Sequence, residues 1–377
     1  MTTSRRDKAA FIPAMAKALM VAALSLSGLA AWSQDGVSKG AVVIGQSVAL
    51  TGPSAALGVP FAQGAKLFFD RLNAGGGVNG RKVELVTMDD GGNPATALAN
   101  TQKLLAQGVF SLFGYYGSPQ VTAAYPAIKD GEIIMFAPMS GADEFRGAVY
   151  PNIYTMRPGY SEEAAAIMRH AETLGAKKLA ILHAADSESM AALDSSERTM
   201  QGGANLVAKA PLSDVAKVIA AKPESVLVIA DARSAAAAIR ELRSKNFRGP
   251  VYGYSNTGES LLAEQLGAAG AGVVVMRVVP RSDNQKLAVV RDLQADAVEA
   301  KAGKANVYML EGYIAARTYT EALRRIPKDP TRAKLRKAID GLDEVSVGGF
   351  RVHFAQDRVA SKLVELSLID SQGKIRE

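Results

Sequence analysis

Short apolar runs rich in β-branched residues alternate along this chain with longer segments in which apolar residues recur every three or four positions. Residues 42–46 form a run too short for a helix and predict a buried strand. Phe61, Ala65 and Phe68 then recur with helical spacing and predict an amphipathic helix. Alternation of this kind predicts an α/β fold with parallel sheets.

The same alternation continues to the end of the chain. Further strands are predicted at residues 82–89, 109–113, 132–136, 178–183, 205–210, 225–230, 251–254, 272–279, 350–354 and 364–369. Further helices are predicted from Asn93-Pro94 onward and at residues 162–174, 188–200, 232–245, 306–323 and 330–339. Because the polar, proline-bearing stretch 150–160 separates two such alternations, we expect a second doubly wound domain.

Three strands of the first half end in loops that carry glycine and hydroxyl groups. These loops span residues 51–58, 114–118 and 139–142. The carboxyl ends of parallel strands share one edge of a sheet, so the three loops are expected to converge there. Each loop alone is also compatible with an ordinary turn, but together they indicate a cleft for a small ligand.

The first 33 residues do not fit the globular pattern. Basic residues at positions 5–8 precede a largely apolar stretch at 18–31, and small residues then flank Trp32. This layout is typical of a cleaved secretory signal peptide. We expect export by the general route, with Ser4-Arg5-Arg6 leaving the twin-arginine route open. No later segment has 18 uninterrupted apolar residues, so no stable membrane insertion is expected.

Composition narrows the function further. The chain has no cysteine, which excludes disulfides, thiolate metal sites and a thiol nucleophile. The formal net charge is +7, and removal of the four cations and one anion of residues 1–33 leaves about +4. The basic residues are scattered, so no nucleic-acid partner is expected.

Motifs for catalysis are missing or stand in the wrong context. Gly75, Gly77 and Gly80 satisfy the dinucleotide pattern GxGxxG, but they follow a helix and enter a strand, whereas a phosphate-binding loop does the reverse. No nucleophile elbow stands between a strand and a helix. Asp89 and Asp90 are better explained by turn and capping roles. We therefore expect no enzyme, cofactor or metal, and predict binding without catalysis.

Several loose motifs together indicate a family. They are Val43-Ile44-Gly45-Gln46 with Leu50-Thr51-Gly52-Pro53, residues 73–81, residues 114–119, Ser140-Gly141-Ala142-Asp143, residues 311–316 and Gly348-Gly349-Phe350. With these motifs, residues 39–377 resemble the periplasmic substrate-binding proteins of branched-chain amino acid type ABC transporters, the leucine/isoleucine/valine-binding type.

The resemblance implies a type I periplasmic binding protein fold. Two Rossmann-like lobes with parallel sheets, joined by three crossovers, would close on a ligand as a hinged clamp. Matching the crossovers puts residues 34–156 and 281–345 in the N-terminal lobe, and residues 157–280 and 346–377 in the C-terminal lobe.

The resemblance also implies a function. The chain would be a monomeric periplasmic receptor that captures a small carboxylate and delivers it to an ABC transporter permease. An amino acid of branched-chain or aromatic type is one class of such ligands. A ligand-sensing subunit of a signalling system remains an alternative.

The first-lobe site residues follow from the same resemblance. Ser118, Ser140 and Gly141 would bind the ligand's carboxylate, and Leu57 would form an apolar wall. Tyr308 falls near a cleft position of the family, although a packed aromatic residue explains it equally well.

The second lobe departs from the family pattern. Ser189-Met190 stand where many relatives have an aromatic residue and a glycine, and Asn256 lies where amino-acid binders commonly have an acid that holds the ammonium group. A buried ammonium without a carboxylate costs several kcal/mol. Asp231, or less favourably Asp186, would have to supply one. The ligand is therefore an amino acid held differently, or an aromatic or aliphatic acid without an ammonium group.

Overall fold

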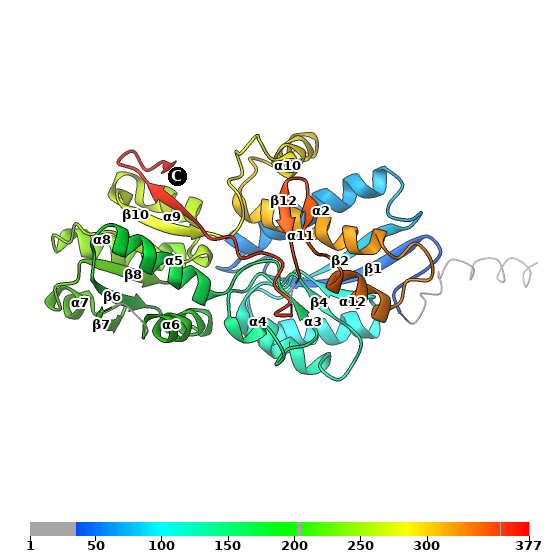
Figure 1. Ribbon diagram of the computed structural model, residues 1–377, viewed down its shortest axis with the longest axis horizontal. Coiled ribbons are helices and arrows are strands. Elements are labelled where there is room, and N and C mark those ends of the chain that lie inside the picture. The colour runs from blue at the N-terminus through cyan, green and yellow to red at the C-terminus, as the bar shows by residue number, and fades with distance from the viewer. Residues whose placement is uncertain (1–34, 202–204, 355, 377) are drawn as a thin grey trace, which may run out of the picture.

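The computed structural model describes residues 35–201, 205–354 and 356–376, and the expected signal peptide, residues 1–33, lies outside them. The chain forms two α/β lobes that lie side by side, the first on the right of Figure 1 and the second on the left. The predicted fold class, two lobes built on mainly parallel sheets, is confirmed.

The first lobe is built on a sheet of five parallel strands in the order β2-β1-β3-β4-β5. Its elements from the first half of the chain are β1 (Ala41–Val48), α2 (Ala55–Ala74), β2 (Lys82–Asp89), α3 (Pro94–Ala106), β3 (Ser111–Phe113), α4 (Ser118–Ala124), η1 (Tyr125–Ala127), β4 (Met135–Phe136), η2 (Asp143–Phe145) and β5 (Ile153–Tyr154). The chain later returns to this lobe as α10 (Ala288–Glu299), α11 (Val307–Arg324), α12 (Arg332–Asp340), β11 (Val345–Val347) and β12 (Phe350–Val352).

The second lobe is built on a seven-stranded sheet in the order β14-β13-β10-β9-β8-β6-β7. Its central strands are parallel, whereas β13 and β14 pair antiparallel at one edge. Its elements are α5 (Tyr160–Thr173), β6 (Lys178–His183), α6 (Ser187–Met200), β7 (Asn205–Pro211), α7 (Val215–Ala220), β8 (Ser225–Ile229), α8 (Ala232–Ser244), β9 (Val251–Gly253), η3 (Ser255–Thr257), α9 (Glu259–Leu266), η4 (Gly267–Gly270), β10 (Val273–Arg277), β13 (Glu365–Ile369) and β14 (Ile375–Arg376).

Alternating side chains of the buried strands supply a core on each face of a sheet. In β1, Ile44 faces a hydrophobic cluster with α2 and α11, while Val43 faces a second cluster with α3 and α4. In β8, Val226 and Leu227 likewise face opposite clusters. Each lobe is therefore a sheet covered by helices on both faces, which leaves the strand ends free to carry loops.

The lobe boundary near the C-terminus differs from the expected one. We placed residues 346–377 in the second lobe, but Val347, Phe350 and Val352 of the β11–β12 hairpin pack in the core cluster of the first lobe. The chain crosses only afterwards, where Ala360 N donates to Thr155 O at 2.9 Å alongside another crossover. Within residues 346–377, which we expected in the second lobe, β13 and β14 are the strands that join the second sheet.

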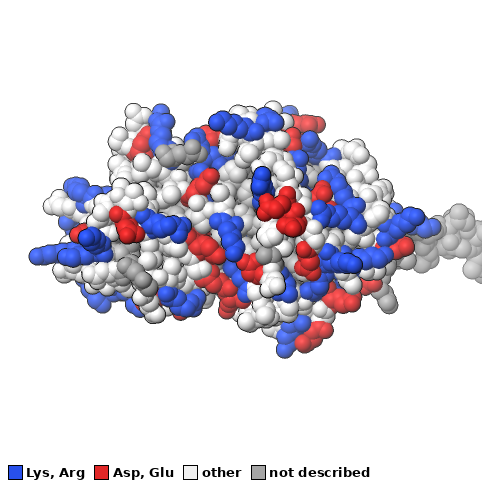
Figure 2. Space-filling model, viewed as in Figure 1, with Lys and Arg blue, Asp and Glu red and all other residues white. Residues whose placement is uncertain are grey.

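Charged side chains are distributed over both lobes. Figure 2 shows Lys and Arg interspersed with Asp and Glu on the visible face rather than gathered in a single stripe. No helix in the described ranges is long and apolar enough to cross a membrane.

Candidate functional site

The loops that follow β1, β3 and β4 meet at one edge of the first sheet. Gln46, near the end of β1, donates to Gly114 O at the start of the second loop at 3.0 Å. The second and third loops are joined through their backbones, because Met139 N donates to Tyr115 O at 2.7 Å and Gly117 N donates to Met139 O at 3.1 Å. The three loops converge, as parallel strands require.

Ser118 and Ser140, which we call the serine pair, are buried side by side in these loops. They are 3% and 0% exposed, and their hydroxyl oxygens lie 2.6 Å apart. Gly141 follows directly, and an added Cβ there would lie 2.5 Å from the Tyr160 ring of the second lobe. The three residues predicted to bind a carboxylate thus lie together, against the second lobe.

A carboxylate of the second lobe contacts the serine pair. Glu188, half-buried in the first turn of α6, accepts hydrogen bonds from Ser118 N at 2.5 Å and from Ser118 Oγ at 3.0 Å. The Tyr160 hydroxyl donates to the same carboxylate. Our sequence reasoning did not single out Glu188. The signal available in the sequence was the position of Glu188, an acidic residue in the first turn of the helix that follows β6, directly before Ser189-Met190.

The other predicted residues of the second lobe serve mainly as helix caps. Ser189 is buried, and its hydroxyl donates to Asp186 Oδ2 at 2.7 Å while its amide donates to Oδ1 at 2.9 Å. Asp231 is exposed and accepts from Arg233 N at 2.9 Å and Ser234 Oγ at 2.6 Å, which caps α8. Capping accounts for Asp231 and Asp186, and Glu188 is the acid that faces the serine pair.

Buried atoms without a hydrogen-bond partner among the described residues include Asn256 Oδ1, Thr257 Oγ1 and the Tyr308 hydroxyl. Tyr308 is 4% exposed, and burial raises its pKa well above the usual value. Its hydroxyl reaches the second lobe, where it would lie 3.1 Å from a Cβ added at Gly258. Leu57 packs in the first-lobe core, 6% exposed. Tyr308 thus brings an unused polar atom to the junction, and Asn256 stands next to Ser255, which contacts Arg157.

A buried guanidinium joins the two lobes close to these residues. Arg157 is 2% exposed; its Nε lies 3.1 Å from Glu311 of the first lobe, and its NH2 donates to Ser255 Oγ of the second at 2.9 Å. Ser255 in turn donates to Glu163 through its amide and its hydroxyl, at 2.7 and 2.8 Å. Burial raises the pKa of both Glu163 and Glu311. Burial alone would lower the pKa of Arg157, but the acidic groups around it, Glu311 and Glu163 first among them, together outweigh burial and raise that pKa.

A second buried guanidinium adds to this junction. Arg277, 2% exposed, ion-pairs with Glu365 at 2.6 Å and lies 3.8 Å from Glu259. Burial raises the pKa of Glu259, which also accepts a hydrogen bond from Ser367. A cavity bordered by Arg157, Arg277 and Tyr308 measures about 10 Å³, room for about one water molecule. Together with the contacts of Ser118 with Glu188 and of Arg157 with Glu311, which cross the junction, this small cavity indicates that the lobes are closed on each other.

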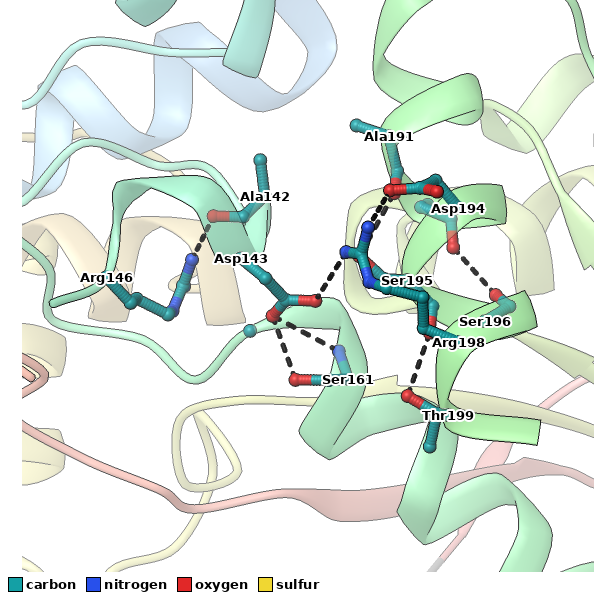
Figure 3. Close-up of polar contacts among 12 residues, drawn as sticks. Ala142, Asp143, Arg146, Ser161, Ala191, Asp194, Ser195, Ser196, Arg198 and Thr199 are labelled. Carbon is teal, nitrogen blue, oxygen red and sulfur yellow. Dashed lines mark hydrogen bonds and ion pairs between the residues drawn. The ribbon is translucent and has the colours of Figure 1, made fainter. Parts of the chain in front are cut away.

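An outer bridge, formed by Asp143, Ser161 and Arg198, links the lobes nearer the solvent (Figure 3). Asp143 of the first lobe accepts from Ser161 Oγ at 2.9 Å, and its Oδ2 lies 3.8 Å from Arg198 of α6. Beside it, the Arg146 guanidinium donates to Pro158 O at 2.7 Å. Burial lowers the pKa of Arg146. These contacts fasten the third loop to the first crossover and to the second lobe.

Two further features lie apart from the predicted site residues. Within the described residues, one group of potential metal ligands occurs, the exposed Asp343, Glu344 and His353. A hollow of about 750 Å³ on the second lobe is lined in part by Leu174 and Leu368. Neither includes the serine pair, so the lobe junction is the candidate site.

With this geometry established, the family follows. Residues 41–374 match the family model for periplasmic binding proteins. The chain belongs to the periplasmic binding protein family. The suspected family is confirmed, and members of this family bind ligands rather than catalyse reactions, as the sequence predicted.

Individual periplasmic binding proteins resemble the chain in part or as a whole. The leucine-, isoleucine-, valine-, threonine- and alanine-binding protein of Pseudomonas aeruginosa is 29% identical over 135 residues, 36% of this chain and 35% of that protein. The Leu/Ile/Val-binding protein homolog 1 of Brucella abortus is 27% identical over 118 residues, 31% of this chain and 30% of that protein. The match thus spans about a third of these curated relatives.

Among solved structures, the similarity extends over most of the chain. The crystal structure of an extracellular ligand-binding receptor from Verminephrobacter eiseniae has a TM-score of 0.81 and 25% identity, and covers 89% of this chain and 100% of that chain. Both lobes of the periplasmic binding protein fold are thus included in the similarity.

Proposed function

We propose that this periplasmic binding protein is a periplasmic solute receptor that captures an amino acid between its lobes and delivers it to an ABC transporter permease. One observation carries the proposal: the Ser118 amide and hydroxyl, with Ser140 behind them, already bind a carboxylate in the closed molecule, that of Glu188. Donors that are buried and fixed in this way are suited to a ligand's carboxylate, because hydrogen bonds to charged groups are stronger than neutral ones.

The surrounding charges favour a ligand that also carries a cation. At the junction, the buried carboxylates of Glu163, Glu259 and Glu311 accompany two buried guanidiniums, and the partly exposed Glu188 and Glu365 add further negative charge. Buried charge without compensation is costly. An amino acid supplies an ammonium group as well as a carboxylate, whereas a plain aliphatic or aromatic acid adds only negative charge. The relatives described above are named for amino acids such as leucine and valine, which supports the same class.

Ligand binding by purified protein tests the proposal. In a thermal-shift panel of amino acids and plain carboxylic acids, one class of amino acid should stabilise the protein, since a ligand at 100 times its Kd adds about 2.7 kcal/mol. Removing a hydrogen bond to a charged group costs about 1.5–3 kcal/mol, so Ser118→Ala should weaken binding by about 10- to 100-fold. Ser140→Ala removes the hydroxyl that hydrogen bonds to Ser118 Oγ and should weaken binding less.

Ser244→Ala is the matched control, because Ser244 is exposed on α8 and its hydroxyl donates to Glu241 O within the same helix. It should bind as the unmodified protein does. A panel in which no small carboxylate raises the melting temperature would refute the proposed function.

A further inference from the structure

Glu188 connects the two lobes at the serine pair. The serine pair belongs to the first lobe, whereas Glu188 stands on α6 of the second. Its carboxylate accepts from Ser118 N at 2.5 Å and from Ser118 Oγ at 3.0 Å, and the Tyr160 hydroxyl donates to it as well. The donors proposed for a ligand's carboxylate are therefore occupied by a carboxylate of the chain itself.

A ligand cannot share these donors with Glu188 in this arrangement. Two carboxylates at one site repel each other, and the neighbouring cavity of about 10 Å³ holds about one water molecule. The ligand must bind when the lobes are apart. Because Glu188 is attached to the second lobe, separating the lobes also withdraws it from the serine pair.

Closure over a bound ligand brings Glu188 back beside the ligand's carboxylate. Helix α6 contacts α4, which begins at Ser118, so the second lobe cannot close fully without returning Glu188 to this place. A ligand that carries a cation next to its carboxylate can pair with Glu188 there. A ligand that lacks the cation faces an unpaired carboxylate instead.

We propose that Glu188 is a tethered competitor for the ligand's carboxylate, which holds the empty clamp closed and selects ligands that carry a cationic group beside the carboxylate. This inference rests on the proposed function for its ligand class. Its first consequence, closure of the empty molecule, does not depend on which ligand binds.

The first experiment uses no ligand. Small-angle X-ray scattering on the purified chain, freed of bound solute by unfolding and refolding, measures the radius of gyration of the empty clamp. Glu188→Ala and Glu188→Gln should both increase it, Glu188→Ala more, because the glutamine side chain keeps a hydrogen-bond acceptor but loses the charge. Glu172→Gln, an equal charge change at an exposed position of α5, should leave it unchanged. Equal radii for the unmodified protein and both Glu188 variants would overturn the inference.

The second experiment compares matched ligands by calorimetry. Leucine with 4-methylpentanoate, valine with 3-methylbutanoate, and phenylalanine with 3-phenylpropanoate differ only by the ammonium group. The unmodified protein should prefer the amino acid of the pair that it binds. Glu188→Gln should reduce that preference by about tenfold or more, about 1.4 kcal/mol, by weakening the amino acid and strengthening the plain acid.

The outcomes separate the two proposals. If a pair binds and its preference is the same in Glu188→Gln, the proposed function stands and the tethered competitor is refuted. If no small carboxylate binds, the proposed function fails, and the scattering measurement alone decides whether Glu188 holds the clamp closed.

Discussion

Asp89 fixes the loop that follows β1. Its carboxylate accepts hydrogen bonds from Thr51 Oγ1 at 2.6 Å, Gly91 N at 2.8 Å and Leu50 N at 2.9 Å. The Thr51 hydroxyl is the largest cause of a pKa that falls from 3.8 to about 2, and the Gly91 amide is the next. The residue thus acts as the brace of a turn, in agreement with the role expected from its place at a strand end.

Asp89→Asn should remove the pH dependence that this brace confers. Because the folded pKa is lowered, the contribution to stability is present above pH 3.8 and is lost as the pH falls through about 2. The carboxylate is exposed and screened by water, so we expect a loss of about 1 kcal/mol near neutral pH. Urea denaturation of both proteins from pH 7 to pH 2 should show this difference shrinking only below about pH 4.

The exposed Asp130 offers a control of the same chemistry, since its side chain is 87% exposed. Asp130→Asn should follow the unmodified protein over the whole pH range. A stability difference for Asp89→Asn that stays constant down to pH 2 would contradict the role assigned to the carboxylate.

Local pattern predicted some site residues and missed others. Ser118, Ser140 and Gly141 could be placed together because the ends of parallel strands must share an edge. The capping role of Asp231 also had a local signal, Ser234 three residues later. Glu188 had no comparable signal for its role, because its contact with Ser118 depends on how far the lobes close, and neither strand period nor helix period determines that distance.

At the scale of elements, α2 and α11 of the first lobe approach each other unusually closely, and they lie side by side in Figure 1. A Cβ added at Gly64 of α2 would lie 1.8 Å from Met309 O of α11. One added at Gly312 of α11 would lie 2.0 Å from Phe61 O of α2. Glycine lets the two backbones pack without an intervening side chain, and α11 carries Tyr308 at its first turn toward the junction.

Gly64→Ala should therefore destabilise the protein, although alanine favours an isolated helix over glycine by roughly 0.5–1 kcal/mol. Forcing a methyl group into this contact typically costs about 1–3 kcal/mol. Chemical denaturation of Gly64→Ala against Gly40→Ala, where nothing lies within 4 Å of the added Cβ, measures the difference. A more stable Gly64→Ala protein would show that the helices can move apart without cost.

Most elements followed from periodicity, but several were missed, α7 and α10 among them. The helix α9 was missed between the strands predicted at 251–254 and 272–279, because it is only 8 residues long and glycines at 258 and 267 border it. The two-residue strand β5 lies in the stretch 150–160, which we read as extended and polar. The β11–β12 hairpin was expected, in part, in the wrong lobe, because lobe membership depends on long-range packing of Phe350 rather than on local pattern.

At the scale of the whole molecule, the contacts between the lobes differ in their exposure to water. Ser118 and Arg157 are buried, at 3% and 2% exposed, so their contacts with the other lobe are shielded from solvent. In the outer bridge, the side chains of Arg198 and Asp143 are 56% and 20% exposed. Salt therefore acts on the outer bridge more than on the buried contacts. The closed arrangement should depend on the buried contacts.

Arg198→Gln tests this ordering of the contacts. An exposed ion pair contributes about 0–1 kcal/mol, so the variant should increase the radius of gyration of the empty protein slightly at low salt. The effect should vanish at about 0.5 M salt, where the Debye length is well below 10 Å. Arg351→Gln is the control, because the Arg351 side chain is 82% exposed in the first lobe. If Arg198→Gln increased the radius of gyration as much as Glu188→Ala does at both salt concentrations, the lobes would be held together by the outer bridge and not by the serine pair.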